Sequence, residues 1–169
     1  MHDKSSMKVS SIKDRYLTFE LDHEKYGVEI LSVKEIIGMQ KTIHIPKTPE
    51  FVKGVMNLRG VIIPVIDLRL KLGMVETERQ MDTAIIIVTI RGINVGFIVD
   101  RVDEVASISS EELTEPPKFG SKVDTDFIKS MANTKKEVAM ILNLESIFDA
   151  DELSSMAHIS KTNITEQGE

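Results

Sequence analysis

Residues that could carry out acid–base, nucleophilic or metal chemistry are few and poorly spaced. The 169-residue chain contains no cysteine, which excludes disulfides, thiolate metal ligands and cysteine nucleophiles. His23 and His44, the two histidines outside the terminal segments, lack His-x-x-x-His spacing, so a zinc site would need further ligands. No serine lies in a Gly-x-Ser-x-Gly sequence, the pattern of a hydrolase nucleophile. We therefore predict no catalytic residue, no metal site and no enzymatic activity.

Glycine and carboxylate clusters also fall short of a cofactor site. Gly54 and Gly60 lack the Lys-Ser/Thr pair of a phosphate-binding loop. Asp100, Asp103 and Glu104 form an acidic cluster, but neighbouring residues of a strand, such as Asp103 and Glu104, point to opposite faces. The sequence predicts no cofactor.

Arg59 is a stronger candidate for recognition. It precedes Gly60 at an expected hairpin tip, whereas the corresponding tip in the second half of the chain carries Lys135-Lys136. A guanidinium has a planar fork suited to a carboxylate, and glycine tolerates a positive φ. Glu35 is the candidate partner. A structural salt bridge and a recognition site are both open interpretations of this pair.

The elements that position these residues are expected to be strands. Ile and Val together outnumber Leu and Ala by 36 to 17, and branching at Cβ favours strands. An internal repeat aligns 16–37 with 85–106 and 51–73 with 127–149, at offsets of 69 and 76 residues. Each half reads as two strands, an extended stretch, a loop, a hairpin and a short helix, the last with Asp67 or Asn143 as expected N-cap.

We predict a mainly all-β protein made of two barrels with short helices, because small sheets hide their edges by closing. The first barrel is expected mainly within 15–73 and the second mainly within 81–149. Residues 1–14 and 151–169 are interpreted as polar tails, the second with at most one helical turn at 151–156.

Three apolar residues have two interpretations each. Val33 and Val102 occupy the same position in the two repeats; they are core residues or the apolar walls of a groove for a partner helix. Phe119 follows Pro116-Pro117; it closes a barrel end or is an exposed anchor.

Composition restricts the partners. The net charge of −6 and an aromatic content of 5% without tryptophan argue against a nucleic-acid surface. No apolar run approaches the roughly 18 residues of a membrane helix, so no direct membrane insertion is expected. We predict a soluble cytoplasmic protein.

Three segments resemble the CheW family of bacterial chemotaxis coupling proteins: FVKGVMNLRGVIIPVIDL (51–68), YGVEILSVKEI (26–36) and VGFIVDRV (95–102). The resemblance covers about 15–150. It implies two SH3-like five-stranded barrels and a non-enzymatic adaptor that couples transmembrane chemoreceptors to the histidine kinase CheA.

The implied partners are the cytoplasmic tip of methyl-accepting chemoreceptors, the CheW-like regulatory domain of CheA, and other CheW-like domains in rings. Such an adaptor would be recruited to membrane receptor arrays. Phe119 is implied in the kinase or ring interface. The implied receptor groove comprises Val33, Glu35, Gly54, Arg59, Gly60, Gly96, Val102 and Val105.

Two alternatives are a scaffold of another chemosensory pathway, such as pilus motility, and an enzyme with a small-ligand cleft between the barrels.

Overall fold

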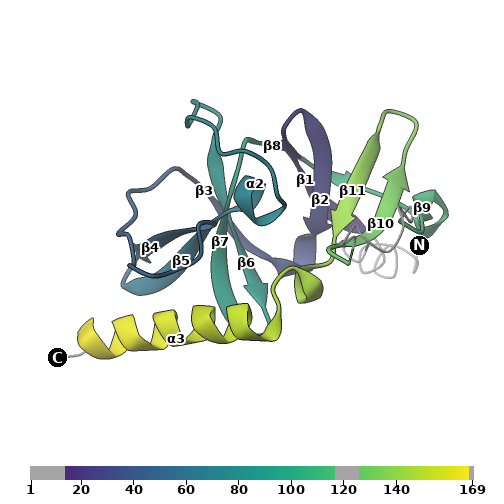
Figure 1. Cartoon of the computed structure of the whole chain (residues 1–169). Coiled ribbons are helices and arrows are strands. Elements are labelled where there is room, and N and C mark those ends of the chain that lie inside the picture. The colour runs from purple at the N-terminus through teal and green to yellow at the C-terminus, as the bar shows by residue number, and fades with distance from the viewer. Residues whose placement is uncertain (1–13, 117–125, 168–169) are drawn as a thin grey trace, which may run out of the picture.

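The computed structural model describes residues 14–116 and 126–167, with side chains up to Ser160 (Figure 1). No helix in these ranges is long and apolar enough to cross a membrane. The helices are α2 (Leu68–Lys71), α3 (Ala150–Gln167) and the 3-10 helices η1 (Ile30–Ser32), η2 (Ser110–Glu112) and η3 (Leu144–Ser146). The strands are β1 (Arg15–Leu21), β2 (Glu24–Glu29), β3 (Val33–Gly38), β4 (Val52–Leu58), β5 (Val61–Asp67), β6 (Ala84–Ile90), β7 (Ile93–Val99), β8 (Arg101–Ser107), β9 (Leu113–Thr114), β10 (Ile128–Asn133) and β11 (Val138–Leu142).

The strands form two sheets, which confirms the prediction of a mainly β protein with two subdomains. The first sheet has the order β8-β1-β2-β11-β10-β9, and the second has the order β3-β6-β7-β5-β4. Each sheet contains one parallel pair, β2 with β11 and β5 with β7.

The internal repeat is visible in the strand register. Gly27 lies opposite Ile141 in the first parallel pair, and Gly96 lies opposite Val65 in the second. The two glycines are 69 residues apart and their partners are 76 apart, the same offsets that align the sequence halves. The pairing therefore follows the repeat.

The assignment of one barrel to 15–73 and the other to 81–149 is wrong. Hairpin β1–β2 of the first half joins β8–β11 of the second half, and hairpin β6–β7 of the second half joins β3–β5 of the first. The chain changes sheets at η1, between β2 and β3, and at Asp100, between β7 and β8. The first hairpin of each half thus belongs to the sheet formed by the rest of the other half. The repeat in the sequence is the same with or without this exchange, so the repeat alone could not reveal it.

A continuous stretch of chain links the two ends of each sheet. In the first sheet β8 runs through η2 into β9, which pairs with β10 at the opposite end of the sheet. In the second sheet the connector after β3 returns to β4, where Ile43 and Val55 exchange two backbone hydrogen bonds of 2.8 and 2.9 Å. β9 and Ile43 thus pair with the outer edges of β10 and β4, whereas β3 and β8 each pair with a strand on one side only among the described residues.

One hydrophobic core joins the two sheets, and each sheet has a smaller core of its own. Because strand side chains alternate, Ile86 and Val88 of β6 enter the shared core while Ile85 and Ile87 enter the core of the second sheet. The shared core also holds Leu17, Phe19, Val28, Val95, Phe97 and Phe148.

The C-terminal segment is a helix rather than the predicted tail with one helical turn. Figure 1 shows α3 running along one end of the second sheet. Met156 is 1% exposed, and Leu153 and Ile159 pack against the shared core. Asp149 and Glu152 each accept a hydrogen bond from the other's backbone N–H, at 2.7 and 2.9 Å, which is a capping box. Three apolar residues spaced by three are a weak sequence signal in a polar segment.

The two expected N-caps differ. The Asp67 side chain accepts a hydrogen bond from the Leu70 N–H at 3.2 Å at the start of α2, which confirms that prediction. Asn143 precedes the 3-10 helix η3, but its side chain makes no capping hydrogen bond.

Candidate functional site

Arg59 and Glu35 form an ion pair across the second sheet. Glu35 lies on β3, at one end of that sheet, and Arg59 lies in the turn between β4 and β5 at the other end. The Arg59 Nη2 donates to both carboxylate oxygens of Glu35, at 2.7 Å to Oε2 and more closely to Oε1. This hydrogen bond raises the pKa of Arg59. The prediction that these two residues meet is confirmed.

The geometry of the pair corrects one expectation. A single nitrogen contacts both oxygens, so the planar fork of the guanidinium is not used against Glu35. The Arg59 side chain is 71% exposed, and no hydrogen bond of its Nε or Nη1 is found among the described residues. Arg59 can therefore bind Glu35 and a partner at the same time. Gly60 follows Arg59 in the turn with φ of +87°, as predicted for a residue with positive φ.

Val33 and Val102 are half-buried residues at equivalent positions. Val33 on β3 lies opposite Val88, and Val102 on β8 lies opposite Phe19. Both valines pack against the shared core. The buried part of each side chain therefore belongs to the core, as one interpretation predicted, and only the exposed part can contact a partner.

Gly54 and Gly96 lie within strands of the second sheet, and neither has a side chain that could contact a partner. A Cβ on Gly54 would lie 2.1 Å from the Ile43 carbonyl oxygen, and a Cβ on Gly96 would lie 2.9 Å from Ile85 Cγ2. Gly54 lets the connector pass close to β4, and Gly96 leaves room for the Ile85 side chain of β6. Both glycines shape the backbone near the site.

Two exposed aliphatic residues mark the outer strands. Val105 on β8 is 49% exposed, as its place in the predicted groove requires, and Ile36 on β3 is 43% exposed. They are 69 residues apart and so occupy equivalent positions in the two repeats. Sequence reasoning missed Ile36, although its alignment with Val105 could have found it.

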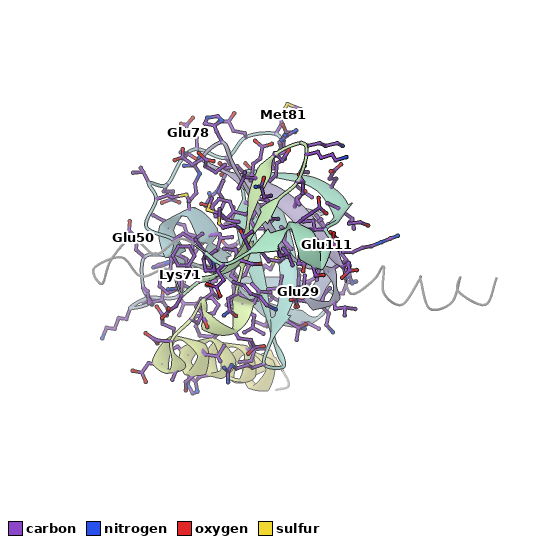
Figure 2. All side chains as sticks on the ribbon, turned by 90° about the vertical axis from the view of Figure 1, so that its right-hand side faces the viewer. Glu29, Glu50, Lys71, Glu78, Met81 and Glu111 are labelled. Carbon is purple, nitrogen blue, oxygen red and sulfur yellow. The ribbon has the colours of Figure 1, made fainter. Side chains whose placement is uncertain are left out.

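Exposed apolar side chains also lie elsewhere, so exposure alone does not identify the site. Val75 is 79% exposed and Met81 fully exposed in the loop between α2 and β6. Met81 and Glu78 lie at the end of the molecule opposite α3 (Figure 2). The described part of the chain has eight exposed large apolar residues, and Ile36 and Val105 are the pair among them that the repeat relates; the others are Leu31, Ile43, Val61, Val75, Met81 and Val138.

The acidic residues of the suspected cluster have separate partners. Asp100 accepts two hydrogen bonds of 2.7 Å from Arg69, a fork-to-carboxylate pair, and a third from the Asp22 N–H at 2.8 Å. Burial alone would raise the pKa of Asp100, but these hydrogen bonds lower it below its ordinary value. Asp103 pairs with Lys25 at 2.7 Å, and this bond lowers the pKa of Asp103. The described residues contain no group of three His, Cys, Asp or Glu side chains that could hold a metal ion.

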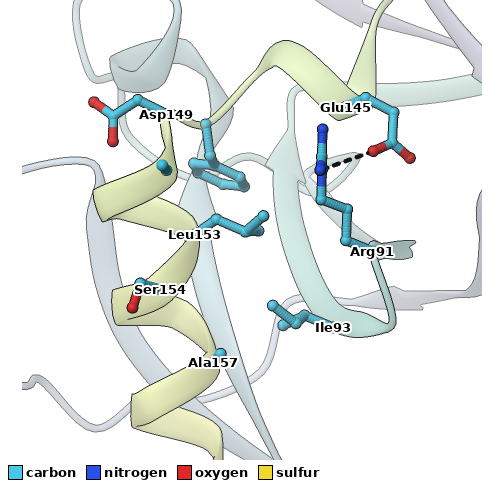
Figure 3. Close-up of a pocket in the computed structure, with 9 residues that line it drawn as sticks. Arg91, Ile93, Glu145, Asp149, Leu153, Ser154 and Ala157 are labelled. Carbon is cyan, nitrogen blue, oxygen red and sulfur yellow. Dashed lines mark ion pairs between the residues drawn. The ribbon is translucent and has the colours of Figure 1, made fainter.

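A surface hollow of about 430 Å³ lies between α3 and the β6–β7 turn (Figure 3). Ile93, Leu153 and Ala157 form its apolar wall. Arg91 and Glu145 form an ion pair of 2.9 Å on the same side of the hollow as Ile93, across from Leu153 and Ala157 of α3 (Figure 3), and both side chains are 60% exposed. Ser154 also lines the hollow, but no hydrogen bond from its hydroxyl to a basic side chain is found among the described residues, and such a bond is the mark of an activated nucleophile. The hollow therefore has the character of a surface groove.

The two histidines belong to different sheets. His23 lies in the β1–β2 turn of the first sheet and His44 in the connector before β4 of the second, and both side chains are exposed. Phe119, the predicted kinase or ring contact, lies outside the described residues.

Two β subdomains related by an internal repeat, with an exposed ion pair across one of them, define a duplicated β protein with a surface for recognition. The family model described as the CheW-like domain matches residues 15–152. The chain belongs to this family of chemotaxis proteins.

Individual relatives agree with the family match. The chain is 30% identical to the chemotaxis protein CheW of Klebsiella aerogenes over 159 residues, covering 94% of this chain and 96% of the relative. It is 32% identical to the chemotaxis protein CheW of Bacillus subtilis over 143 residues, covering 84% and 91%. The crystal structure of the scaffolding protein TtCheW from Thermoanaerobacter tengcongensis is similar with a TM-score of 0.75 and 38% identity, covering 83% of this chain and 95% of that one.

Proposed function

We propose that the protein is a non-enzymatic adaptor that couples chemoreceptors to the histidine kinase CheA. Membership of the CheW-like family over residues 15–152 carries this proposal. The adaptor binds the cytoplasmic tip of a methyl-accepting chemoreceptor and the CheW-like regulatory domain of CheA, and joins other CheW-like domains in rings. It acts in the cytoplasm, at receptor arrays on the membrane.

The receptor surface is centred on β3 and the β4–β5 turn. Glu35, Ile36 and Arg59 combine an exposed aliphatic side chain with a guanidinium that retains free donors. Arginine is enriched among the residues that supply most of the energy of protein–protein contacts, and side chains packed at the centre of an interface contribute most. Val105 on β8 extends the surface at the repeat-equivalent position, and Val33 and Val102 support both strands from the core. Gly54, Gly60 and Gly96 act through the backbone, because none of them presents a side chain.

Binding of a receptor fragment to surface variants tests the proposal. Ile36→Ser and Val105→Ser should each weaken the affinity for a chemoreceptor cytoplasmic hairpin about tenfold, since a packed aliphatic anchor contributes more than about 1 kcal/mol. Isothermal titration calorimetry measures the dissociation constant. Val138→Ser is the matched control, because Val138 is another exposed strand valine, 53% exposed.

Two results would contradict the proposal. One is the absence of binding by the unaltered protein to the receptor hairpin and to the CheW-like domain of CheA. The other is an equal loss of receptor affinity in Val138→Ser and Val105→Ser, which would show that the surface on β3 and β8 is not the receptor-binding site.

A further inference from the structure

The β4–β5 turn holds both of its residues in the left-handed region. Arg59 has φ of 52° and Gly60 has φ of 87°. Such a turn matches the twist of a hairpin, but glycine, asparagine and aspartate are favoured there over residues such as arginine. The sequence thus places an unfavoured residue at the position from which a guanidinium reaches Glu35. Another contact has to hold this turn in its conformation.

Asn57 provides that contact. Its side-chain Oδ1 accepts a hydrogen bond of 2.8 Å from the Gly60 N–H. This N–H belongs to the peptide group between Arg59 and Gly60, so the bond fixes the orientation of the peptide that follows the Arg59 Cα. We propose that Asn57 is a positioning residue that keeps the Arg59 guanidinium directed at Glu35 and available to the receptor.

A second Arg-Gly turn in the chain shows why the Asn57 contact matters. Arg91 and Gly92 have nearly the same conformation, with φ of 49° and 81°. Ile90, directly before that turn, is 1% exposed, whereas Leu58, directly before the Arg59 turn, is half-buried and packs against the core of the second sheet. Core packing thus anchors the turn at Arg59 less completely than the turn at Arg91, and the Asn57 hydrogen bond adds to what packing supplies.

The repeat-equivalent asparagine has a different environment. Asn133 lies 76 residues after Asn57, at the end of β10. The turn that follows is held by Thr134, whose hydroxyl donates to the Glu137 carbonyl oxygen at 2.9 Å and accepts from the Glu137 N–H at 3.2 Å. No hydrogen bond of the Asn133 side chain is found among the described residues. Asn133 is therefore a matched control for Asn57.

The first test needs no partner. In Asn57→Ala, amide hydrogen exchange at Gly60, measured by NMR, should be about fivefold faster, since one lost hydrogen bond is worth about 1 kcal/mol and about 1.4 kcal/mol corresponds to tenfold. Asn57→Asp retains an acceptor oxygen and should restore slow exchange. Asn133→Ala should leave the Gly60 amide unchanged. Unchanged exchange at Gly60 in Asn57→Ala would overturn the positioning role.

The second test rests on the proposed function. Asn57→Ala should weaken binding of the chemoreceptor cytoplasmic hairpin about fivefold, and Asn57→Ala combined with Arg59→Ala should bind no more weakly than Arg59→Ala alone, because coupled residues are not additive. Additive losses, or normal binding in Asn57→Ala beside weak binding in Arg59→Ala, would overturn the inference. Normal binding in Arg59→Ala would instead contradict the receptor site of the proposed function, while the Gly60 exchange would still decide the role of Asn57.

Discussion

Gly54 is the position where one added methyl group should damage the fold most. Its φ is +130°, and a Cβ would lie 2.1 Å from the Ile43 carbonyl oxygen. A strained backbone of this kind costs about 1–3 kcal/mol. Moving Ile43 away would break its two backbone hydrogen bonds with Val55, a further loss of about 1–3 kcal/mol. Gly54→Ala should therefore lower the free energy of unfolding by about 3–5 kcal/mol, a large part of the roughly 5–15 kcal/mol typical of a domain.

Two other glycines separate the causes. Gly38 has an ordinary φ, and a Cβ added to it would have no atom within 4 Å, so Gly38→Ala should change the free energy of unfolding by no more than about 0.5 kcal/mol. Gly60 has open space but φ of +87°, so Gly60→Ala should cost about 1 kcal/mol from the backbone alone. The expected order of destabilisation is Gly54 first, Gly60 second and Gly38 last.

Urea unfolding followed by far-UV circular dichroism measures these differences, because the chain has no tryptophan for fluorescence. Equal slopes of free energy against urea would show that the variants unfold from the same compact state. If Gly54→Ala unfolded within about 1 kcal/mol of Gly38→Ala, the connector could not be held against β4 by Gly54, and the steric argument would fail.

Three further perturbations have defined outcomes. Arg59→Ala should weaken binding of the receptor hairpin, measured by calorimetry. Arg91→Ala, which removes the exposed arginine of the other Arg-Gly turn, should leave that binding unchanged. Equal effects of the two substitutions would show that Arg59 has no specific role in binding. Asp100 has a folded pKa below its ordinary 3.8, so its stabilisation is present above pH 3.8 and lost as the pH falls through the folded pKa; the Tm advantage of the unaltered protein over Asp100→Asn should shrink from pH 6 to about pH 3, and a constant advantage would contradict this. Met156→Ala should lower the free energy of unfolding by about 2–4 kcal/mol through a cavity in the shared core, whereas exposed Ser155→Ala should have little effect; equal urea midpoints for these two variants would show that α3 is not part of the core.

The strands and the duplication could be predicted from the sequence, but their assignment to sheets could not. Ile and Val patterns at fixed offsets locate the hairpins, and the parallel pairs of Gly27 and Gly96 follow those offsets. The same pattern results whether a hairpin joins its own half or the other half. The choice depends on where the chain turns after β2 and β7, and the residues there, η1 and Asp100, have no sequence signal for it.

The candidate site was predictable where chemistry was involved and less so where packing decides. Opposite charge and a tight turn were enough to pair Arg59 with Glu35. The role of Gly54 depends on its contact with Ile43 in the connector, and this contact cannot be read from the sequence around Gly54. Ile36 follows Glu35 in a strand whose residues alternate between exposed and half-buried, and the apolar type of Ile36 alone does not distinguish burial from a contact surface.

The exchange of hairpins has a mechanical consequence for an adaptor. β2 of the first sheet is joined to β3 of the second by the three residues of η1, which can span at most about 10 Å. β7 of the second sheet is joined to β8 of the first by Asp100 alone, and Arg69 and the Asp22 N–H hold that residue with three hydrogen bonds. Each strand of the proposed receptor surface is thus the direct continuation of a hairpin in the other sheet. Because the two sheets also share one core, a partner bound at β3 or β8 is held in a fixed orientation to both subdomains, as a signalling scaffold requires.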